Sequence, residues 1–385
     1  MIEEADFTAL CQNRDPRTGE RLTARHDENR TVGYDLNWHV PKGVSLAYAV
    51  GGDERIAAVF DRAVAETMAE IEAEAATRVR TNGRQEDRTT GNLVWGQFLH
   101  TTTRPDEQGV PDPHLHAHCF VFNVTHDPQE DRYKAAQFRE LKRDANYFEA
   151  RMHARLAKAL HEELGYAIRR DGRQWDVAGL APELKQKFSR RTAEIEALAA
   201  EHGVTNAEQK AELGARTRKA KANRKTFPEL QTEWRSRLTA DEADAVADLK
   251  ETPIQEQVLI TPEAAVRQPI DHCFERESVV PERKVLAEAL RIGAGSIDVR
   301  TVAAEAERQG LRTRTLEGRR LSTTPAVLAD ERAVLDFAKH GRGSVEPLNP
   351  NWMPEKDSFL SEEQTDAVQR LAGSRDRLQL LLGGA

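Results

Sequence analysis

The sequence lacks the usual features of a secreted or membrane protein. Its 385 residues include three cysteines, far apart and without C-x-x-C spacing, which disfavours both a disulfide framework and a thiolate zinc site. No apolar run approaches the ~20 residues that cross a membrane. The acidic start MIEEADFTAL also has no apolar core of a secretory signal. These absences predict a protein of the reducing cytoplasm that is not inserted in a membrane.

An overall excess of positive charge is missing too. The formal net charge is -8, which does not by itself suggest a protein that binds nucleic acid. Phosphate binding depends on local basic surfaces and not on the sum. Basic residues do cluster, in AIRRDGR (Arg169, Arg170, Arg173), in KQKFSRR and between Ala215 and Lys225. Each cluster is either a phosphate-binding surface or a solvated helix face.

The pattern of apolar residues predicts strands followed by helices. The stretch TVGYDLNWHV (31–40) alternates, with Asp35, Asn37 and His39 on its polar face, as in a half-buried strand. GNLVWGQFLH and HLHAHCFVFNV predict two further strands, which pair as a hairpin joined by a polar loop. An amphipathic helix is expected from Asp53 to about Arg80, a hairpin around Asp171-Gly172, and helices over most of the remaining chain. The expected fold class is α+β, with an antiparallel sheet covered by helices.

The stretch PDPHLHAHCFVFN (111–123) contains three of the twelve histidines. On a strand, His116 and His118 project from the same face because alternate side chains do so. His100 ends the neighbouring strand and could supply a third ligand to a metal ion. Three protein ligands would leave positions open for substrate, as in catalytic sites. His114 shares the face nearer the loop and is expected to be a bystander. The alternative is a polar strand edge without a metal.

Imidazole ligands favour Mn²⁺ or Zn²⁺, whereas phosphate oxygens in the shell would also make Mg²⁺ suitable. Asp35 either accepts a hydrogen bond from a ligand histidine, acts as a general base, or is a solvated strand residue. Arg30 and Lys42 are candidate phosphate contacts or surface charges.

Three motifs together, GYDLNWHVPKGVSLAYAVGG, TTGNLVWGQFLH and PDPHLHAHCFVFN, resemble conjugative relaxases of the TrwC/TraI (MobF) family, which are HUH endonucleases. The resemblance spans roughly Phe7 to the mid-200s. It implies a palm-like antiparallel sheet covered by helices, in a bacterial protein. It also implies strand-specific cleavage of single-stranded plasmid DNA at the origin of transfer, with the conjugation machinery as a further partner. A tyrosine would attack the scissile phosphate, giving a 5′-phosphotyrosine and a free 3′-OH. By motif, His100, His116 and His118 correspond to the metal ligands, and Asp35 to the catalytic aspartate.

The C-terminal part resembles the beginning of the helicase half of these proteins. LSEEQTDAVQRLAG is similar to an entry helix, and LQLLLGGA to a strand that leads to a P-loop. The chain ends before the lysine of that motif, so no ATPase activity is expected. The predicted organisation is a relaxase domain over residues 1–250, a small mainly helical module over 251–345 and the start of a helicase motor over 356–385.

The expected nucleophile is missing. Relaxases of this family carry tyrosines near the N-terminus, whereas the first tyrosine here is Tyr34. Tyr34 points away from Asp35 on the expected strand and is assigned to the core. The sequence therefore predicts a protein that binds a metal ion and DNA but lacks the tyrosine that complete nicking requires. An accessory DNA-binding module with a vestigial site, and a metal hydrolase with another substrate, are the alternatives.

Overall fold

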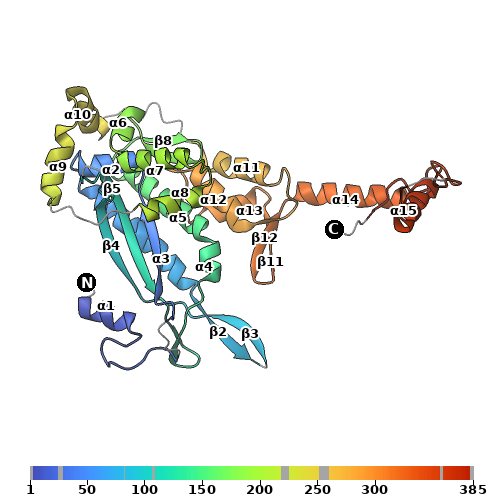
Figure 1. Cartoon of the computed structure of the whole chain (residues 1–385), viewed down its shortest axis with the longest axis horizontal. Coiled ribbons are helices and arrows are strands. Elements are labelled where there is room, and N and C mark those ends of the chain that lie inside the picture. The colour runs from blue at the N-terminus through green and yellow to red at the C-terminus, as the bar shows by residue number, and fades with distance from the viewer. Residues whose placement is uncertain are drawn as a thin grey trace. The chain divides into compact units, whose positions relative to one another are not determined.

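The computed structural model describes residues 3–24, 29–81, 83–105, 109–217, 225–250, 260–355 and 359–381 (Figure 1). It divides into two compact units. The first consists of Met1–Ile270 with Arg283–Gln309, and the second of Asp271–Glu282 with Gly310–Ala385. The domain boundaries expected from the sequence remain a prediction.

A three-stranded antiparallel sheet forms the centre of the first unit. Its order is β1 (Gly33–His39), β5 (Pro113–Phe122) and β4 (Trp95–Thr102). The predicted strand at 31–40 and the predicted pair that contains the histidines are therefore confirmed. The register places His116 opposite both His39 on β1 and His100 on β4. A β-bulge follows His100, before the loop that connects β4 to β5.

Helices cover one face of this sheet. α2 (Lys42–Ala49), α3 (Arg55–Ala73) and α5 (Ala145–Glu162) pack there (Figure 1). The strands present alternate apolar side chains to these helices, because a strand that is buried on one face must repeat every two residues. The residues concerned are buried: Trp38, Leu115, Ala117, Cys119 and Val121. The opposite face carries Asp35 and the histidines.

The helix predicted from Asp53 to about Arg80 ends at Ala73. β2 (Ala76–Thr81) and β3 (Arg84–Thr89) form a hairpin where the prediction extended that helix. Thr77 and Val79 are β-branched and buried in this hairpin, and branching at Cβ favours strand over helix. The prediction recognised the apolar spacing of the helix but not its end.

The other elements of the first unit are short. β6 (Thr125–Asp127) pairs with β7 (Arg132–Lys134), and the predicted hairpin around Asp171-Gly172 is confirmed as β8 (Ile168–Asp171) and β9 (Gln174–Val177). The helices in this part of the chain are α1 (Glu4–Cys11), α4 (Arg139–Arg143), α6 (Pro182–Lys187), α7 (Arg190–Glu201), α8 (Ala207–Arg216), α9 (Phe227–Ser236), α10 (Ala240–Ala247), α11 (Pro262–Cys273), α12 (Glu282–Ile292) and α13 (Val302–Arg308), with a 3₁₀ turn, η1 (Asp248–Lys250).

The second unit contains a small antiparallel sheet and two helices. The sheet has the order β10 (Val280–Pro281), β12 (Arg319–Thr323), β11 (Arg312–Leu316). α14 (Pro325–His340) and α15 (Glu362–Gly373) follow. The strand expected after α15 is wrong for the described residues 374–381, which form none. An apolar run becomes a strand only when a neighbouring strand takes its hydrogen bonds. Among the described helices, none is both long and apolar enough to span a bilayer.

Candidate metal centre

Three histidines converge on the uncovered face of the central sheet. His100 lies opposite His116 in the β4–β5 register, and His118 follows His116 two positions later on the same face. One ring nitrogen from each of the three lies within 4.8 Å of the others. The ring centroids are 4.9–5.2 Å apart. The sequence therefore predicted a set of side chains that the fold does bring together.

Hydrogen bonds orient two of these rings. Nδ1 of His116 donates to the carbonyl oxygen of His114 at 2.9 Å, and Nδ1 of His118 donates to Oδ2 of Asp35 at 2.7 Å. With a proton on Nδ1, each ring keeps the lone pair of Nε2 for a ligand bond. Burial lowers the pKa of His116 to about 4, so this imidazole is neutral at pH 7. A neutral imidazole is the form that coordinates metal ions.

This donor set fits a divalent transition metal. Three imidazole nitrogens suit zinc, manganese or copper, and three protein ligands leave coordination positions open. The hydrogen bond from His118 to Asp35 is of the kind that fixes the tautomer and orientation of histidines in metal sites.

Replacing Asp35 with asparagine should weaken divalent metal binding about tenfold. The amide can keep a hydrogen bond to His118, but it no longer stabilises the positive charge that metal binding places on the ring. Isothermal titration with Mn²⁺ or Zn²⁺ measures the change. The matched control is Asp87→Asn on β3, where the exposed carboxylate pairs with Arg78 and not with a histidine; its metal affinity should equal that of the unchanged chain. An unchanged affinity in Asp35→Asn would show that Asp35 does not act on the metal centre.

A cavity of about 810 Å³ opens over the triad. Its floor is the sheet face, and its walls come from α7, α8 and the start of α9. The walls supply four cations, Arg104, Arg191, Lys210 and Lys225. Arg191 donates to the carbonyl oxygens of Gly214 and Thr217, which ties α7 to α8. The sequence marked the clusters that contain Arg191 and Lys225, but it did not single out these residues. Of the cluster between Ala215 and Lys225, residues 218–224 lie outside the described part.

Two further histidines extend the polar face. Nδ1 of His39 lies 3.2 Å from Nε2 of His114, and the ring of His114 lies 4.6 Å from that of His116. Both line the cavity, but neither belongs to the three converging histidines, and the expectation that His114 is a bystander to the metal ligands stays a prediction. Burial lowers the pKa of His114 to about 3. His39 was noted only as a polar strand position, because its place depends on the β1–β5 register.

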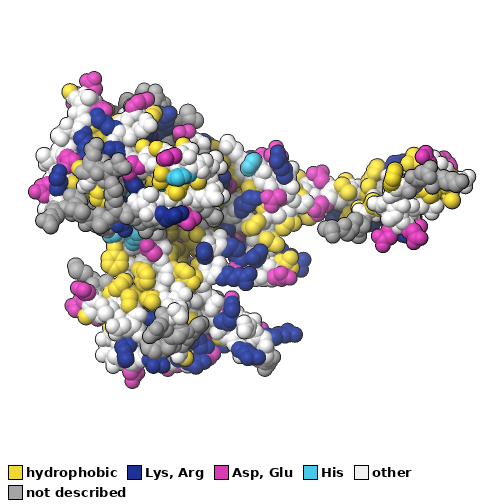
Figure 2. Space-filling model, in the orientation of Figure 1, with side chains coloured by type: hydrophobic (Ala, Val, Ile, Leu, Met, Phe, Trp, Pro, Cys, Tyr) yellow, Lys and Arg dark blue, Asp and Glu magenta, His cyan; other side chains and the backbone are white. Residues whose placement is uncertain are grey.

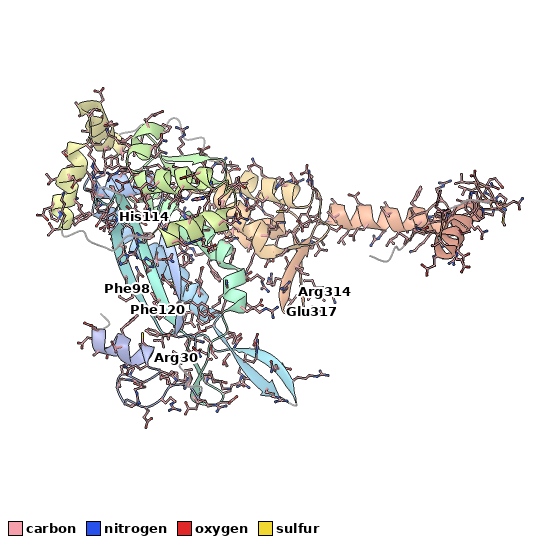
Figure 3. All side chains as sticks on the ribbon, in the orientation of Figure 1. Arg30, Phe98, His114, Phe120, Arg314 and Glu317 are labelled. Atoms are coloured by element: carbon pink, nitrogen blue, oxygen red, sulfur yellow. The ribbon has the colours of Figure 1, made fainter. Side chains whose placement is uncertain are left out.

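An aromatic cluster continues the same face beyond the histidines. Phe98 lies opposite His118 in the register and is 39% exposed. Phe7 of α1 packs against it with ring centroids 5.7 Å apart, and against Phe120 at 5.6 Å. Phe98 and Phe120 lie along the sheet below His114 in Figure 3, and Figure 2 shows histidine and hydrophobic side chains close together on this side. The sheet therefore presents the histidines and the aromatic rings side by side on one face.

The predicted phosphate contacts have other partners. Nζ of Lys42 donates to the carbonyl oxygens of Pro113 and Phe188 at 2.8 and 2.9 Å, which holds the start of β5 against the end of α6. Arg30 donates to the carbonyl oxygen of Cys11, and Figure 3 places it near the end of the sheet opposite to His114. Neither of these contacts involves the triad, so a role of Lys42 or Arg30 in DNA binding stays a prediction.

The predicted arginines of the β8–β9 hairpin also lie outside the triad cavity. Arg170 donates to the carbonyl oxygen of Ile292, and Arg173 forms an ion pair with Glu288. Arg169 and Arg173 line a second cavity of about 640 Å³, together with Lys42 and His39. His39 lines both cavities, so the two cavities are neighbours. The hairpin lines only the second one and therefore lies beside the histidine triad and not over it.

None of the five tyrosines lines the triad cavity in the described part of the chain. Tyr34 is 40% exposed and packs against Phe138 with ring centroids 4.4 Å apart, so its assignment to the core was wrong. This end of β1 borders an open groove along α4 and α5. Tyr166 is buried and donates its hydroxyl hydrogen to Asp53 at 2.9 Å. No tyrosine hydroxyl is thus placed to act beside the histidines.

Comparison with known proteins gives a consistent result. The family model described as TrwC relaxase matches residues 1–240. The multifunctional conjugation protein TraI of Escherichia coli (strain K12) is 31% identical over 268 residues, which is 65% of this chain and 15% of that protein. A second TraI from Escherichia coli is 38% identical over 125 residues, 32% of this chain and 7% of that protein. The chain thus spans less than a sixth of the length of these relatives.

Solved structures resemble the fold as well. The conjugative relaxase TrwC in complex with oriT DNA, in a copper-bound structure, has 32% identity and a TM-score of 0.56, and the match covers 63% of this chain and 82% of that one. TrwC bound to a 27-mer DNA with the recognition hairpin and the cleavage site has 31% identity and a TM-score of 0.56, with coverages of 63% and 86%. These likenesses confirm the predicted fold class.

Proposed function

Because the chain belongs to the TrwC relaxase family, we propose that it binds single-stranded DNA at an origin of transfer. We also propose that His100, His116 and His118 hold a divalent metal ion at the phosphate to be cut. The single observation that carries this proposal is the triad of converging imidazoles at the floor of a cavity with cationic walls. The similar structure of TrwC, which is bound to copper and in complex with oriT DNA, supports a site that takes both a metal ion and a DNA strand.

The parts of the cavity suit a DNA strand. Arg191, Lys210 and Lys225 line its walls. They form ion pairs with Glu194, Glu196 and Glu233, which they would exchange for phosphates of the strand. Phe98 is exposed beside the histidines, and aromatic rings on a sheet are platforms on which bases stack. A divalent ion in the triad would supply charge stabilisation to a non-bridging phosphate oxygen. Phosphate oxygens in the shell make Mg²⁺ or Mn²⁺ suitable, while the three nitrogens also suit Zn²⁺.

Nicking by transesterification needs a hydroxyl group beside the triad. The hydroxyl oxygen gives up its proton and attacks phosphorus, the bond from phosphorus to O3′ breaks, and O3′ takes up one proton to give the 3′-OH, so that no net proton is released. We propose that this step is incomplete in the chain, because the cavity lining contains none of its five tyrosines. A tyrosine from another polypeptide segment would have to enter the cavity for a covalent 5′-phosphotyrosine to form.

Incubation with Mn²⁺ or Mg²⁺ and an end-labelled origin oligonucleotide is expected to give binding without a covalent adduct. Gel shift measures the binding, and denaturing electrophoresis separates free, cleaved and protein-linked DNA. The matched control is His118→Ala, which removes a proposed ligand. A protein–DNA adduct would contradict the missing nucleophile, and cleavage without an adduct would identify water as the attacking group.

An accessory DNA-binding role is the second candidate. The same absence of a tyrosine from the cavity favours it, and in that case the histidine site would be vestigial, so that DNA binding would not need a metal ion. Binding that does not change on removal of metal with a chelator would support this role. The helicase start and the expected lack of ATPase activity stay predictions, as does contact with the conjugation machinery.

A further inference from the structure

The β11–β12 hairpin of the second unit ends in a tight two-residue turn. Leu316 pairs with Arg319, and Glu317 and Gly318 between them have positive φ values of 49° and 75°. Two consecutive left-handed residues define a turn whose twist matches that of paired strands. The hairpin is thus a regular ribbon with a well-defined register. Figure 3 shows Arg314 and Glu317 near its free end.

The register sorts the side chains of the ribbon onto two faces. Residues opposite each other in an antiparallel pair lie on the same face. Arg312, Arg314, Leu316 and Arg319 therefore share one face with Leu321 and Thr323. The other face holds Thr313, Thr315, Arg320 and Ser322, and it is attached to Glu282: Thr313 donates to this carboxylate at 3.1 Å, and Arg320 donates at 2.5 and 2.8 Å.

The first face is basic and open. Arg312, Arg314 and Arg319 are all exposed, and Leu316 at the tip is 56% exposed. Within the described ranges of the chain, no carboxylate forms an ion pair with these three arginines, whereas Arg320 on the other face is paired. Figure 2 shows Lys and Arg side chains gathered over this hairpin. Three guanidinium groups on one side of a ribbon form a row of unneutralised charge.

Phosphate groups are the natural complement of such a row. Guanidinium groups bind phosphate oxygens through paired hydrogen bonds, and a two-stranded ribbon is narrow enough to lie along a groove or a strand of DNA.

We propose that the β11–β12 hairpin is a second DNA-binding element, separate from the histidine cavity. Arg312, Arg314 and Arg319 bind the phosphate backbone of a DNA strand, and Leu316 contacts its sugars or bases. The contact is independent of base sequence because guanidinium groups that bind phosphates carry no base information. It does not depend on metal binding or on nicking, so it can hold even if the function proposed for the histidine cavity fails.

Measuring the affinity of the full chain for a fluorescent oligothymidine and for a duplex of random sequence tests this proposal. Chelator is present throughout so that metal at the histidines does not contribute. The triple variant R312Q/R314Q/R319Q should bind at least one of the two probes about tenfold more weakly at about 50 mM salt. Each lost contact with a single strand removes about 0.7 from the slope of log affinity against log salt, so the slope should fall by about 2.

A matched control separates a local contact from a general effect of charge. R276Q/R332Q/R342Q removes the same three charges from exposed arginines elsewhere in the second unit, and its affinity should change less than twofold. A photo-crosslinking residue at Leu316 should become attached to the DNA in the chain that carries His116→Ala as well. The proposal is overturned if the hairpin variant binds both probes like the unchanged chain, if the control loses as much affinity, or if no crosslink forms at position 316.

Discussion

Replacing His116 with alanine is expected to lower the affinity for Mn²⁺ or Zn²⁺ by more than about 100-fold. His116 lies between the other two triad members, opposite His100 in the register and two positions before His118. The variant leaves two imidazoles, which cannot enclose one face of an ion. Removing a residue that hydrogen-bonds to a metal ligand typically lowers metal affinity 10- to 100-fold, so removing the ligand itself should lower it more.

Isothermal titration or competition with a coloured chelator measures this change. His126→Ala is the matched control, because His126 lies on β6 and pairs with Asp131 at 3.2 Å, away from the triad. The control should bind metal like the unchanged chain. Because His116 is buried, circular dichroism must show that its variant stays folded. An affinity within about threefold of the unchanged value, in a folded variant, would rule out the triad as the metal centre.

Replacing Asp112 with alanine is expected to reduce the free energy of unfolding of the first unit by about 3 kcal/mol. The side chain of Asp112 is 2% exposed and accepts hydrogen bonds from Nε and Nη2 of Arg190 at 3.0 and 2.9 Å and from Arg237 at 3.2 Å. It also accepts from the backbone N–H of Arg190 at 2.9 Å. Removing the carboxylate takes away a buried acceptor that both guanidinium groups share, and breaking such a buried ion pair costs more than the pair contributes.

The position of Asp112 links this stability to the site. It directly precedes β5, and its partners Arg190 and Arg237 belong to α7 and to the end of α9. Urea unfolding followed by tryptophan fluorescence reports on this unit, since Trp38, Trp95, Trp175 and Trp234 lie in it. Asp112→Asn should lose less, because its amide oxygen still accepts a hydrogen bond. Asp244→Ala, at an exposed position of α10, should change the midpoint little. Equal midpoints for Asp112→Ala and Asp244→Ala would contradict the role of this ion-pair cluster.

Local patterns predicted much of the fold and the triad. The alternation of TVGYDLNWHV identifies a strand because one face of β1 is buried and the other is not. The two-residue spacing of His116 and His118 fixes them on one face without any tertiary information. His100 required only that two consecutive strands pair as a hairpin, which is their usual arrangement.

Contacts between distant segments could not be predicted in this way. The closeness of His39 and His114 depends on the register of β1 against β5, which the fold sets across 75 residues. The sequence around Lys42 does not distinguish it from a surface lysine, yet its ammonium group donates to two carbonyl oxygens, at the start of β5 and just after α6. Lys210 and Lys225 reach the cavity only because α8 and α9 lie over it. A single sequence carries no signal for such packing.

X-ray absorption at the zinc edge of the metal-loaded chain tests the central claim most directly, because it reports the atoms bound to the ion. The triad of His100, His116 and His118 predicts three imidazole nitrogens at about 2.0–2.1 Å, with the remaining positions taken by oxygen. The imidazole signal should weaken in His118→Ala. A shell of oxygen atoms alone, or an imidazole count that does not change in this variant, would contradict the assignment of the metal centre.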